Sequence, residues 1–270
     1  CVRMSAEALK FKQSNPQLNY KKMSLMELQK LPTHNGIIDF KISNTSFFML
    51  NVLNDDSSVV KYFWQDSHDL LCLDLWFELS LEKGTFIDVG AHTGLYSLTT
   101  LKANRENGVV CIEPYFMNMS RLITNFRLNG LDKHITTILG AASNVDGKVK
   151  FNISTEKSYL SKGGKIDRDG FEINSYKLDN LFYGKLDKPL KAIKIDTEGE
   201  DYNVLIGSEG LINEYKPKII IEVREENKQD IQNFLFKYNY KIFNIANLNE
   251  EINLENIKID NISNVFAKCF

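Results

Sequence analysis

The sequence has no long apolar run. None of its 270 residues falls in a segment near the ~20 apolar residues that a membrane-spanning helix needs. The opening residues, CVRMSAEALKFKQ, also lack the apolar core of a secretory signal. We therefore expect a soluble, cytoplasmic protein without a membrane span. The chain begins at Cys1 rather than at methionine, so a larger parent polypeptide remains open.

Cysteine is scarce, and neither sign of charge is in excess. The four cysteines, Cys1, Cys72, Cys111 and Cys269, form no CxxC pair, which argues against zinc and dithiol motifs and favours reduced thiols. The 33 Lys and Arg residues against 35 Asp and Glu residues give a net charge of -2, so nothing attracts the chain to a polyanion. We expect neither a metal site nor a nucleic-acid partner.

The whole chain, with 43% hydrophobic and 25% charged residues, has the ordinary composition of a globular protein. Residues 1–80 differ in pattern from the remainder. Ser24–Lys30 opens with a capping-box pattern and predicts a short helix. Ile37–Val52 predicts a hairpin and Asp69–Leu81 a second helix. We interpret 1–80 as a cap on a main domain at 81–270. A purely stabilising layer would explain the same pattern.

From residue 84 onward, strand and helix patterns alternate. Seven strands are predicted, at Thr85–Val89, Val109–Glu113, Ile135–Leu139, Ala192–Asp196, Lys218–Val223, Tyr240–Ile245 and Asn264–Phe270. Helices are predicted at Leu95–Ala103, Asn118–Leu128, Asn227–Phe236 and from Tyr202 onward. This alternation indicates an α/β fold with parallel strands and right-handed crossovers. Val149–Leu181 interrupts it with two β-like pieces around a loop at Ser158–Gly170.

The stretch TFIDVGAHTGLY is an apolar strand that runs into an acid and two glycines. Such a turn lets the backbone approach a nucleotide-like ligand closely. A dinucleotide fingerprint GxGxxG counted from Gly90 would need glycine where His92 and Leu95 stand. The spacing DxGxxxG, from Asp88 through Gly90 to Gly94, is more typical of S-adenosylmethionine enzymes, whose cofactor has no pyrophosphate for a helix N-terminus to hold.

Two further strand ends carry residues suited to a nucleoside. Glu113, followed by Pro114, ends the second strand where doubly wound folds bind ribose, because one carboxylate can accept two hydroxyl donors. A solvated strand-end acid is the plainer alternative. Gly140, Ala141 and Ala142 follow the third strand and leave room for a flat adenine, although small residues there also suit packing against a helix.

KIDTEGED forms a second acidic centre. Strand alternation places Lys194 and Asp196 on the same face. Asp196 and Glu198 fall at the carboxyl end of the strand, the edge at which open α/β sheets bind ligands. Glu200 and Asp201 are assigned to the start of the next helix, where acids favour the helix dipole. Asp196 and Glu198 are therefore candidate functional residues.

Glu222 and two histidines complete the candidates. Glu222 follows three isoleucines, one strand away from KIDTEGED. An ion pair with Lys194 or Arg224 is the first interpretation of it, a general base the second and a ligand of a divalent cation the third. His92 is also an eligible base, whereas His134 is expected on the surface.

Taken in order, these motifs resemble the FkbM-type methyltransferases, a branch of the class I S-adenosylmethionine-dependent enzymes. The matching segments are FIDVGAHTGLYSL, CIEP, NFRLNGL, AAS with a following DG, KLDNL, KIDTEGED and IIIEV, and they span about residues 85–224. Residues 1–80 carry little of the resemblance. In such enzymes, substrate choice often lies in a variable region of that kind.

The resemblance implies a Rossmann-like, seven-stranded, mostly parallel sheet with an antiparallel last strand. It also implies O-methylation of a hydroxyl on a sugar, glycan or secondary metabolite, with S-adenosylmethionine as cofactor and S-adenosylhomocysteine as product. By motif, the cofactor would be bound by Asp88, Gly90, Ala91, Gly94, Glu113, Pro114, Ala141 and Asp196. The catalytic candidates are Asp196, Glu198 and His92. The carboxylates are the first choice as base, and His92 is kept because an unperturbed carboxylate is a weak base at neutral pH.

Two other classes remain open. A nucleotide-cofactor oxidoreductase of the NAD type is supported by Glu113 and opposed by the missing glycines. A noncatalytic nucleoside-binding module of the same fold is opposed by the intact acids. We expect a small-molecule or glycan acceptor, and a homodimer remains open.

Overall fold

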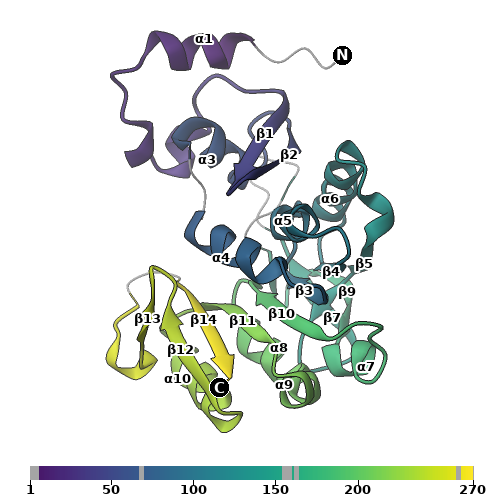
Figure 1. Ribbon diagram of the computed structural model, residues 1–270. Coiled ribbons are helices and arrows are strands. Elements are labelled where there is room, and N and C mark those ends of the chain that lie inside the picture. The colour runs from purple at the N-terminus through teal and green to yellow at the C-terminus, as the bar shows by residue number, and fades with distance from the viewer. Residues whose placement is uncertain (1–5, 67–69, 154–159, 161–163, 260–262, 270) are drawn as a thin grey trace.

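The computed structural model of the protein describes residues 6–66, 70–153, 160, 164–259 and 263–269. Cys1, the first residue of the helix predicted at Asp69–Leu81, the last residue of the strand predicted at Asn264–Phe270, and positions 158–159 and 161–163 of the predicted loop lie outside the described residues. In Figure 1 the N-terminal segment, residues 6–66 and 70–80, begins at one end of a domain built on a large sheet, and its last helix lies against that domain.

That sheet has eight strands in the order β13-β12-β14-β11-β10-β3-β4-β5. The strands are β3 (Thr85–Val89), β4 (Gly108–Glu113), β5 (Ile135–Leu139), β10 (Leu190–Ile195), β11 (Lys218–Val223), β12 (Tyr240–Asn244), β13 (Asn247–Glu251) and β14 (Ser263–Cys269). Strands β11, β10, β3, β4 and β5 run parallel, and β14 runs antiparallel to both of its neighbours. The seven predicted strands and the antiparallel last strand are confirmed. Strand β13 is an addition, because its wholly exposed sequence NLNEE carries no apolar alternation that would predict it.

Strand alternation divides the core between the two faces of the sheet. Phe86 packs in a cluster with α4, α5 and α6, whereas its neighbour Ile87 packs with α7, α8, α9 and α10. These helices are α4 (Leu70–Ser80), α5 (Leu95–Ala103), α6 (Phe116–Leu128), α7 (Leu178–Phe182), α8 (Asp201–Gly207), α9 (Glu209–Tyr215) and α10 (Lys228–Lys237), with short 3-10 turns at η2 (Asp132–His134) and η3 (Leu254–Asn256). In the part of the chain that the structure describes, no helix has the length and apolar character needed to cross a membrane.

A second sheet of four strands, in the order β6-β9-β7-β8, occupies the interval that breaks the regular alternation. Its strands are β6 (Ala141–Ala142), β7 (Gly147–Asn152), β8 (Lys165–Ile166) and β9 (Phe171–Tyr176). The two β-like pieces expected there correspond to β7 and β9, which pair antiparallel. Pairing of β6 with β9 joins this sheet to the end of β5 and so places it beside the ligand edge of the main sheet.

The N-terminal segment contains α1 (Ala6–Ser14), η1 (Tyr20–Lys22), α2 (Leu25–Leu28), β1 (Gly36–Ile42), β2 (Thr45–Asn51), α3 (Ser57–Gln65) and α4. The capping box of Ser24 and Glu27 and the β1–β2 hairpin are both confirmed. Helix α3 was not predicted, because SSVVKYFWQ is rich in β-branched and aromatic residues. Its N-cap Asp56 and the burial of Val59, Val60 and Trp64 outweigh that preference.

One hydrophobic cluster runs across the predicted boundary at residue 80. Phe40 and Met49 of the hairpin belong to the same cluster as Trp76 of α4 and Phe86 of β3. The Trp76 indole N–H also donates to the carbonyl of Tyr96 at 3.1 Å. The hairpin and α4 are therefore part of the core of the main domain, and a division of the chain at residue 80 stays a prediction.

Candidate functional site

A pocket of about 480 Å³ opens at the carboxyl ends of β3, β4, β10 and β11. The chain order of the strands reverses between β3 and β10, and open α/β sheets bind ligands at such a switch point. All the predicted site residues except Gly94 line this pocket: Asp88, Gly90, Ala91, His92, Glu113, Pro114, Ala141, Asp196 and Glu198. Gly94 instead ends the turn as the N-cap of α5, where its backbone adopts φ 89°.

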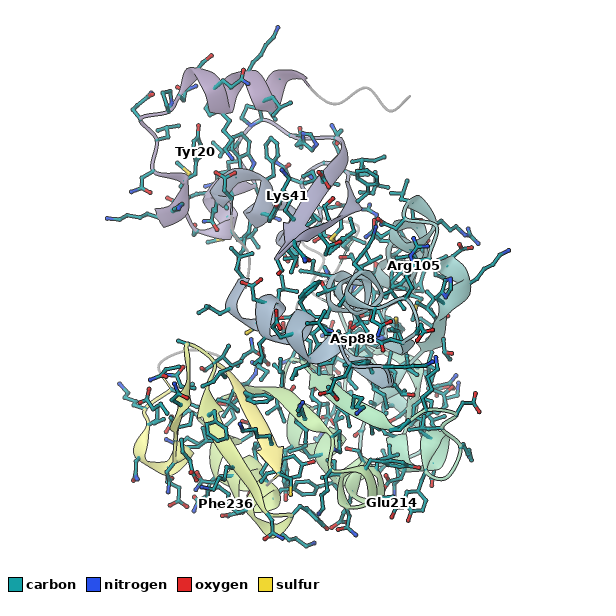
Figure 2. The ribbon with its side chains drawn as sticks, in the orientation of Figure 1. Tyr20, Lys41, Asp88, Arg105, Glu214 and Phe236 are labelled. Atoms are coloured by element: carbon teal, nitrogen blue, oxygen red, sulfur yellow. The ribbon has the colours of Figure 1, made fainter. Side chains whose placement is uncertain are left out.

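Asp88 lies in the interior of the domain (Figure 2) and is 2% exposed. Its Oδ2 accepts hydrogen bonds from the backbone N–H and the hydroxyl of Ser97, at 3.1 and 2.6 Å, and so caps the first turn of α5. Its Oδ1 has no hydrogen-bond partner among the described residues. Burial raises the pKa of this carboxyl, while Lys194 and Ser97 act in the opposite direction. One oxygen thus caps the helix, and the other is buried without a partner among the described residues.

Four backbone N–H groups of the glycine turn donate hydrogen bonds within the protein. The N–H groups of Gly90 and Ala91 both donate to the carbonyl of Ile112, at 2.9 and 3.0 Å. That of His92 donates to Glu113, and that of Gly94 to the carbonyl of Ala91. A pyrophosphate needs free amides of this kind and disfavours nearby carboxylates. The turn therefore suits a ligand without phosphate.

Gly90 also sets the spacing between the two acidic centres. A Cβ at this position would lie 1.8 Å from the backbone oxygen of Asp196, and the residue adopts φ +78°, in the left-handed region. Only glycine lets the turn and the end of β10 approach so closely. The close contact brings the glycine turn that follows β3 and the loop of Asp196 into one pocket.

Glu113 fastens the opposite side of the turn. Its carboxylate accepts from the backbone N–H groups of His92 and Tyr115, both at 2.9 Å, and from the amide of Asn118 at 3.1 Å. The pKa of Glu113 is raised, because burial outweighs the opposite effect of His92 and of these hydrogen bonds. A carboxylate has about four acceptor positions, so three protein donors leave room for a ligand hydroxyl.

Lys194 and Asp196 form an ion pair at the end of β10. The Lys194 ammonium lies 2.8 Å from Asp196 Oδ2 and 4.5 Å from the ring centre of Tyr96. The side chain of Lys194 is 3% exposed and that of Asp196 is 35% exposed. Burial acts to raise the pKa of Asp196, but the charge of Lys194, with His92 and Arg224, outweighs it and holds the pKa below its usual range. The predicted common face of Lys194 and Asp196 is confirmed.

Glu198 and Glu222 share one arginine. Arg224 donates to Glu198 at 2.6 Å and to Glu222 at 2.9 and 3.1 Å, so the first interpretation of Glu222, an ion pair, is confirmed. Burial, followed by the charges of Asp196 and Asp201, raises the pKa of Glu222 to about 8. Burial likewise raises the pKa of Glu198. Among the described residues no cluster of His, Cys, Asp and Glu is arranged to hold a metal ion.

His92 and Glu198 both have left-handed backbone conformations, at φ 48° and 55°. The Nε2 of His92 is buried without a partner among the described residues, and its Nδ1 lies 3.4 Å from the hydroxyl of Thr93. Backbone strain of this kind concentrates at functional sites.

His134 and Asp201 were predicted to lie outside the functional site. His134, expected on the surface, is exposed in η2. Asp201 is buried and accepts hydrogen bonds from the backbone N–H and the hydroxyl of Thr197, which is a structural role.

Two walls of the pocket were not predicted. Phe151 and Ile166 of the small sheet close one side, and Ser57, Ser58 and Lys61 of α3 close another. Phe151 was visible only as one residue of a β-like piece. No sequence pattern marked the α3 residues, because only tertiary packing places them at the pocket. Lys194 was placed on the face of Asp196 by the alternation in KIDTEGED, but it was not among the predicted site residues.

The residues present fit S-adenosylmethionine. The pocket lining carries six carboxyl groups, from Asp88, Glu113, Asp196, Glu198, Glu200 and Glu222, against the two ammonium groups of Lys61 and Lys194. The acids outnumber the ammonium groups even with Glu222 protonated. This charge favours a cationic sulfonium and disfavours a dinucleotide. Glu113 and the small Ala141, which are expected to contact the ribose and the adenine, both line the pocket.

Replacing Asp88 with asparagine should separate ligand binding from stability. The folded state disfavours the charge on Asp88, so its stability falls as pH rises from the ordinary carboxyl pKa through the raised one. The variant loses this cost and should gain in melting temperature relative to the wild type as pH rises above the ordinary carboxyl pKa. Its affinity for S-adenosylhomocysteine should fall at least about tenfold, because a bond to a charged acceptor is lost. Thermal melts and calorimetry test both, and unchanged affinity would contradict this role.

Comparison with known proteins identifies the family. The model of the Methyltransferase FkbM domain matches residues 88–242. A comparison with curated proteins gave no match. The FkbM methyltransferase of Methylobacillus flagellatus KT has 18% identity over 70% of this chain, with a TM-score of 0.46, and the match spans 50% of that protein.

Two further solved structures are similar at lower identity. TYW2 of M. jannaschii, in complex with AdoMet, has 14% identity over 88% of this chain and 86% of its own, with a TM-score of 0.44. A SAM-dependent O-methyltransferase of Thermotoga maritima has 10% identity over 88% of this chain and 78% of its own, with a TM-score of 0.46. The domain model covers more than half of the residues and includes the glycine turn from Asp88 to Gly94. The chain therefore belongs to the FkbM family of S-adenosylmethionine-dependent methyltransferases.

Proposed function

We propose that the protein transfers the methyl group to a hydroxyl of a sugar, glycan or secondary metabolite. The observation that carries the proposal is the Lys194–Asp196 pair, in which a carboxylate held at 2.8 Å by a buried ammonium keeps a third of its side chain exposed in the pocket. S-Adenosylmethionine supplies an electrophilic methyl group. The chain has to bind the acceptor, align its oxygen and remove its proton.

Asp196 is the base that we favour. Because Lys194 keeps its pKa low, Asp196 is ionised at neutral pH but is a weak base, so it takes the hydroxyl proton as the new O–C bond forms and makes that proton acidic. Lys194 also fixes one carboxylate oxygen, so the other is oriented toward the acceptor. Glu198 accepts a hydrogen bond from Arg224 at 2.6 Å. This contact favours a role in positioning Arg224 over a role as the base. His92 stays a candidate through its unpartnered Nε2.

Glu222 as the base is the competing proposal, and it predicts a different pH dependence of the rate. With a pKa of about 8 it is largely protonated at neutral pH. If Glu222 were the base, the rate would rise with pH through that value. With Asp196 as base, ionisation is complete well below neutral pH and no rise near pH 8 comes from this group.

The acceptor side of the pocket is polar. Ser57, Ser58 and Lys61 line it from α3, and Asn264 lines it from β14 beside Glu222. The side-chain oxygen of Asn264 is buried without a partner among the described residues. A polyhydroxylated acceptor would satisfy such groups, whereas a flat apolar acceptor would leave them unpaired. This supports a sugar or glycan over an apolar metabolite.

The proposal is tested by turnover of S-adenosylmethionine with a panel of free sugars, glycans, phenolic metabolites and transfer RNA. We expect S-adenosylhomocysteine to form with a hydroxylated acceptor, and mass spectrometry to find the new methyl group as an ether. Methylation of transfer RNA, or of nitrogen alone, would overturn the proposal. The absence of a nucleic-acid partner, the cytoplasmic location and a homodimer stay predictions.

A further inference from the structure

The free edge of β2 is closed by side chains of α6. Arg121, Asn125 and the C-cap Asn129 are spaced four residues apart and so share one face of the helix. Asn129 exchanges two hydrogen bonds with the backbone of Phe48, at 2.8 and 2.9 Å. The N–H of Leu50 donates to Asn125 at 2.9 Å, and the carbonyl of Leu50 accepts from Arg121 at 2.9 Å. The row replaces the neighbouring strand that β2 lacks on this edge.

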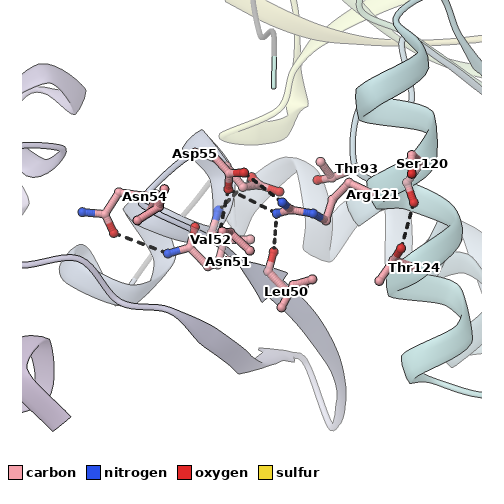
Figure 3. Close-up of polar contacts among 12 residues, drawn as sticks. Leu50, Asn51, Val52, Asn54, Asp55, Thr93, Ser120, Arg121 and Thr124 are labelled. Carbon is pink, nitrogen blue, oxygen red and sulfur yellow. Dashed lines mark hydrogen bonds and ion pairs between the residues drawn. The ribbon is translucent and has the colours of Figure 1, made fainter. Parts of the chain in front are cut away.

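An ion pair anchors one end of the row. Arg121 donates to both carboxylate oxygens of Asp55, at 3.1 and 2.8 Å, as Figure 3 shows beside its contact with Leu50. The side chains are 12% and 2% exposed, so water screens the pair little. The next residue, Asp56, caps α3 through the N–H groups of Ser58 and Val59. Docking of the hairpin on α6 therefore also fixes where α3 begins.

Asn125 differs from the other two residues of the row. Its Oδ1 accepts from Leu50, and its Nδ2 donates to the carbonyl of Thr93 at 2.9 Å, inside the glycine turn. Asn125 is fully buried, so both ends of the amide are in use without water. Leu122 and Phe126 flank it and lie 3.0 Å from where a Cβ of Gly94 would be. A single side chain thus joins the hairpin edge to the turn that lines the pocket.

We propose that Asn125 is a positioning residue that couples docking of the N-terminal hairpin to binding of the cofactor. When the turn is held for a ligand, the Thr93 carbonyl orients the amide of Asn125, and the same amide then holds the N–H of Leu50. Because coupling between two sites is reciprocal, the docked hairpin in turn raises affinity for the cofactor. The inference goes beyond the proposed function and does not depend on which acceptor is methylated.

The coupling reaches the acceptor side through α3. Ser57, Ser58 and Lys61 stand directly after the hairpin and its anchor Asp55, and they line the pocket. A cofactor that tightens the hairpin therefore also orders this wall. Without Asn125 the hairpin would keep the Arg121–Asp55 pair and the two Asn129 bonds but lose its link to the glycine turn.

The test compares Asn125→Ala with Asn129→Ala, the same residue type one helical turn further along the row. Calorimetry gives the Kd of S-adenosylhomocysteine, and NMR gives amide exchange at Phe48 and Leu50 with and without it. In the wild type the ligand should slow exchange at Leu50 at least about fivefold. In Asn125→Ala that slowing should vanish and Kd should rise at least about fivefold. In Asn129→Ala exchange at Phe48 should accelerate while Kd stays within about twofold.

Asn125→Asp is the second variant, because it keeps an acceptor for the Leu50 N–H and loses the amide donor to Thr93. Its Kd should rise as in Asn125→Ala, with ligand-free exchange at Leu50 closer to the wild type. The proposal is overturned if Asn125→Ala and Asn125→Asp bind with the wild-type Kd, or if ligand still slows exchange at Leu50 in Asn125→Ala. An equal rise in Kd for Asn129→Ala would also overturn it, since general loosening of the hairpin would then explain the effect.

Discussion

Replacing Asp196 with asparagine should lower kcat by about 10²- to 10⁴-fold, the range that a positioned general base contributes. The amide keeps the shape of the side chain and a carbonyl oxygen for Lys194, but it cannot take a proton from the acceptor. The Kd of S-adenosylhomocysteine should change only a few-fold, because the rest of the pocket is intact. Single-turnover kinetics with a hydroxylated acceptor, together with calorimetry, separates the two effects.

Glu198→Gln is the matched control for this variant. It alters the second predicted carboxylate in the same loop and weakens the contact with Arg224 at 2.6 Å. We expect a smaller loss of kcat, since Glu222 still holds Arg224. If Glu198→Gln lost more activity than Asp196→Asn, the base would be Glu198. If neither variant lowered kcat, no carboxylate of this loop would be the base, and His92 would be the remaining one of the three predicted candidates.

Replacing Gly90 with alanine should reduce the free energy of unfolding by about 2–5 kcal/mol. A left-handed backbone costs an alanine about 1–2 kcal/mol, and overpacking adds about 1–3 kcal/mol. The clash is with the backbone oxygen of Asp196 at 1.8 Å, which cannot move away as a flexible side chain could. The acidic loops would be pushed apart, so binding of S-adenosylhomocysteine should also be lost. Denaturant unfolding and calorimetry measure the two quantities.

Gly130→Ala is the control for Gly90→Ala. Gly130 has φ +65° but no atom within 4 Å of the added Cβ, so it carries the conformational cost without the clash. We expect a loss of about 1 kcal/mol and unchanged ligand binding. Equal losses for the two variants would show that close approach to Asp196 is not what requires glycine at position 90.

Much of the fold could be predicted because its signals are local. Strands β3, β4 and β11 are short, mainly apolar runs, and Asp88, Glu113 and Asp196 stand at or next to the ends of strands. Carboxyl ends of parallel strands meet at one edge, so these acids could be brought together from topology alone. The capping box at Ser24 and the hairpin at Ile37–Val52 are likewise encoded within a few residues.

The rest depends on contacts between distant residues. Helix α3 contradicts its own β-branched composition and forms because its N-cap and its packing on the N-terminal segment favour it. The wall at Phe151 exists only because β7 pairs with β9 across the interrupted interval. The raised pKa of Glu222 comes from burial and from carboxylates on another loop. The double role of Asn125 joins positions 75 and 32 residues away in sequence, and no local pattern marks it.

We expect the pocket at the ends of β3, β4 and β10 to bind an adenosyl sulfonium and not a dinucleotide. Titration calorimetry of the purified chain with S-adenosylmethionine, S-adenosylhomocysteine and NAD tests this most directly. We predict saturable binding of the first two, and neither binding of NAD nor competition by it. Binding of NAD with no uptake of S-adenosylhomocysteine would contradict the account.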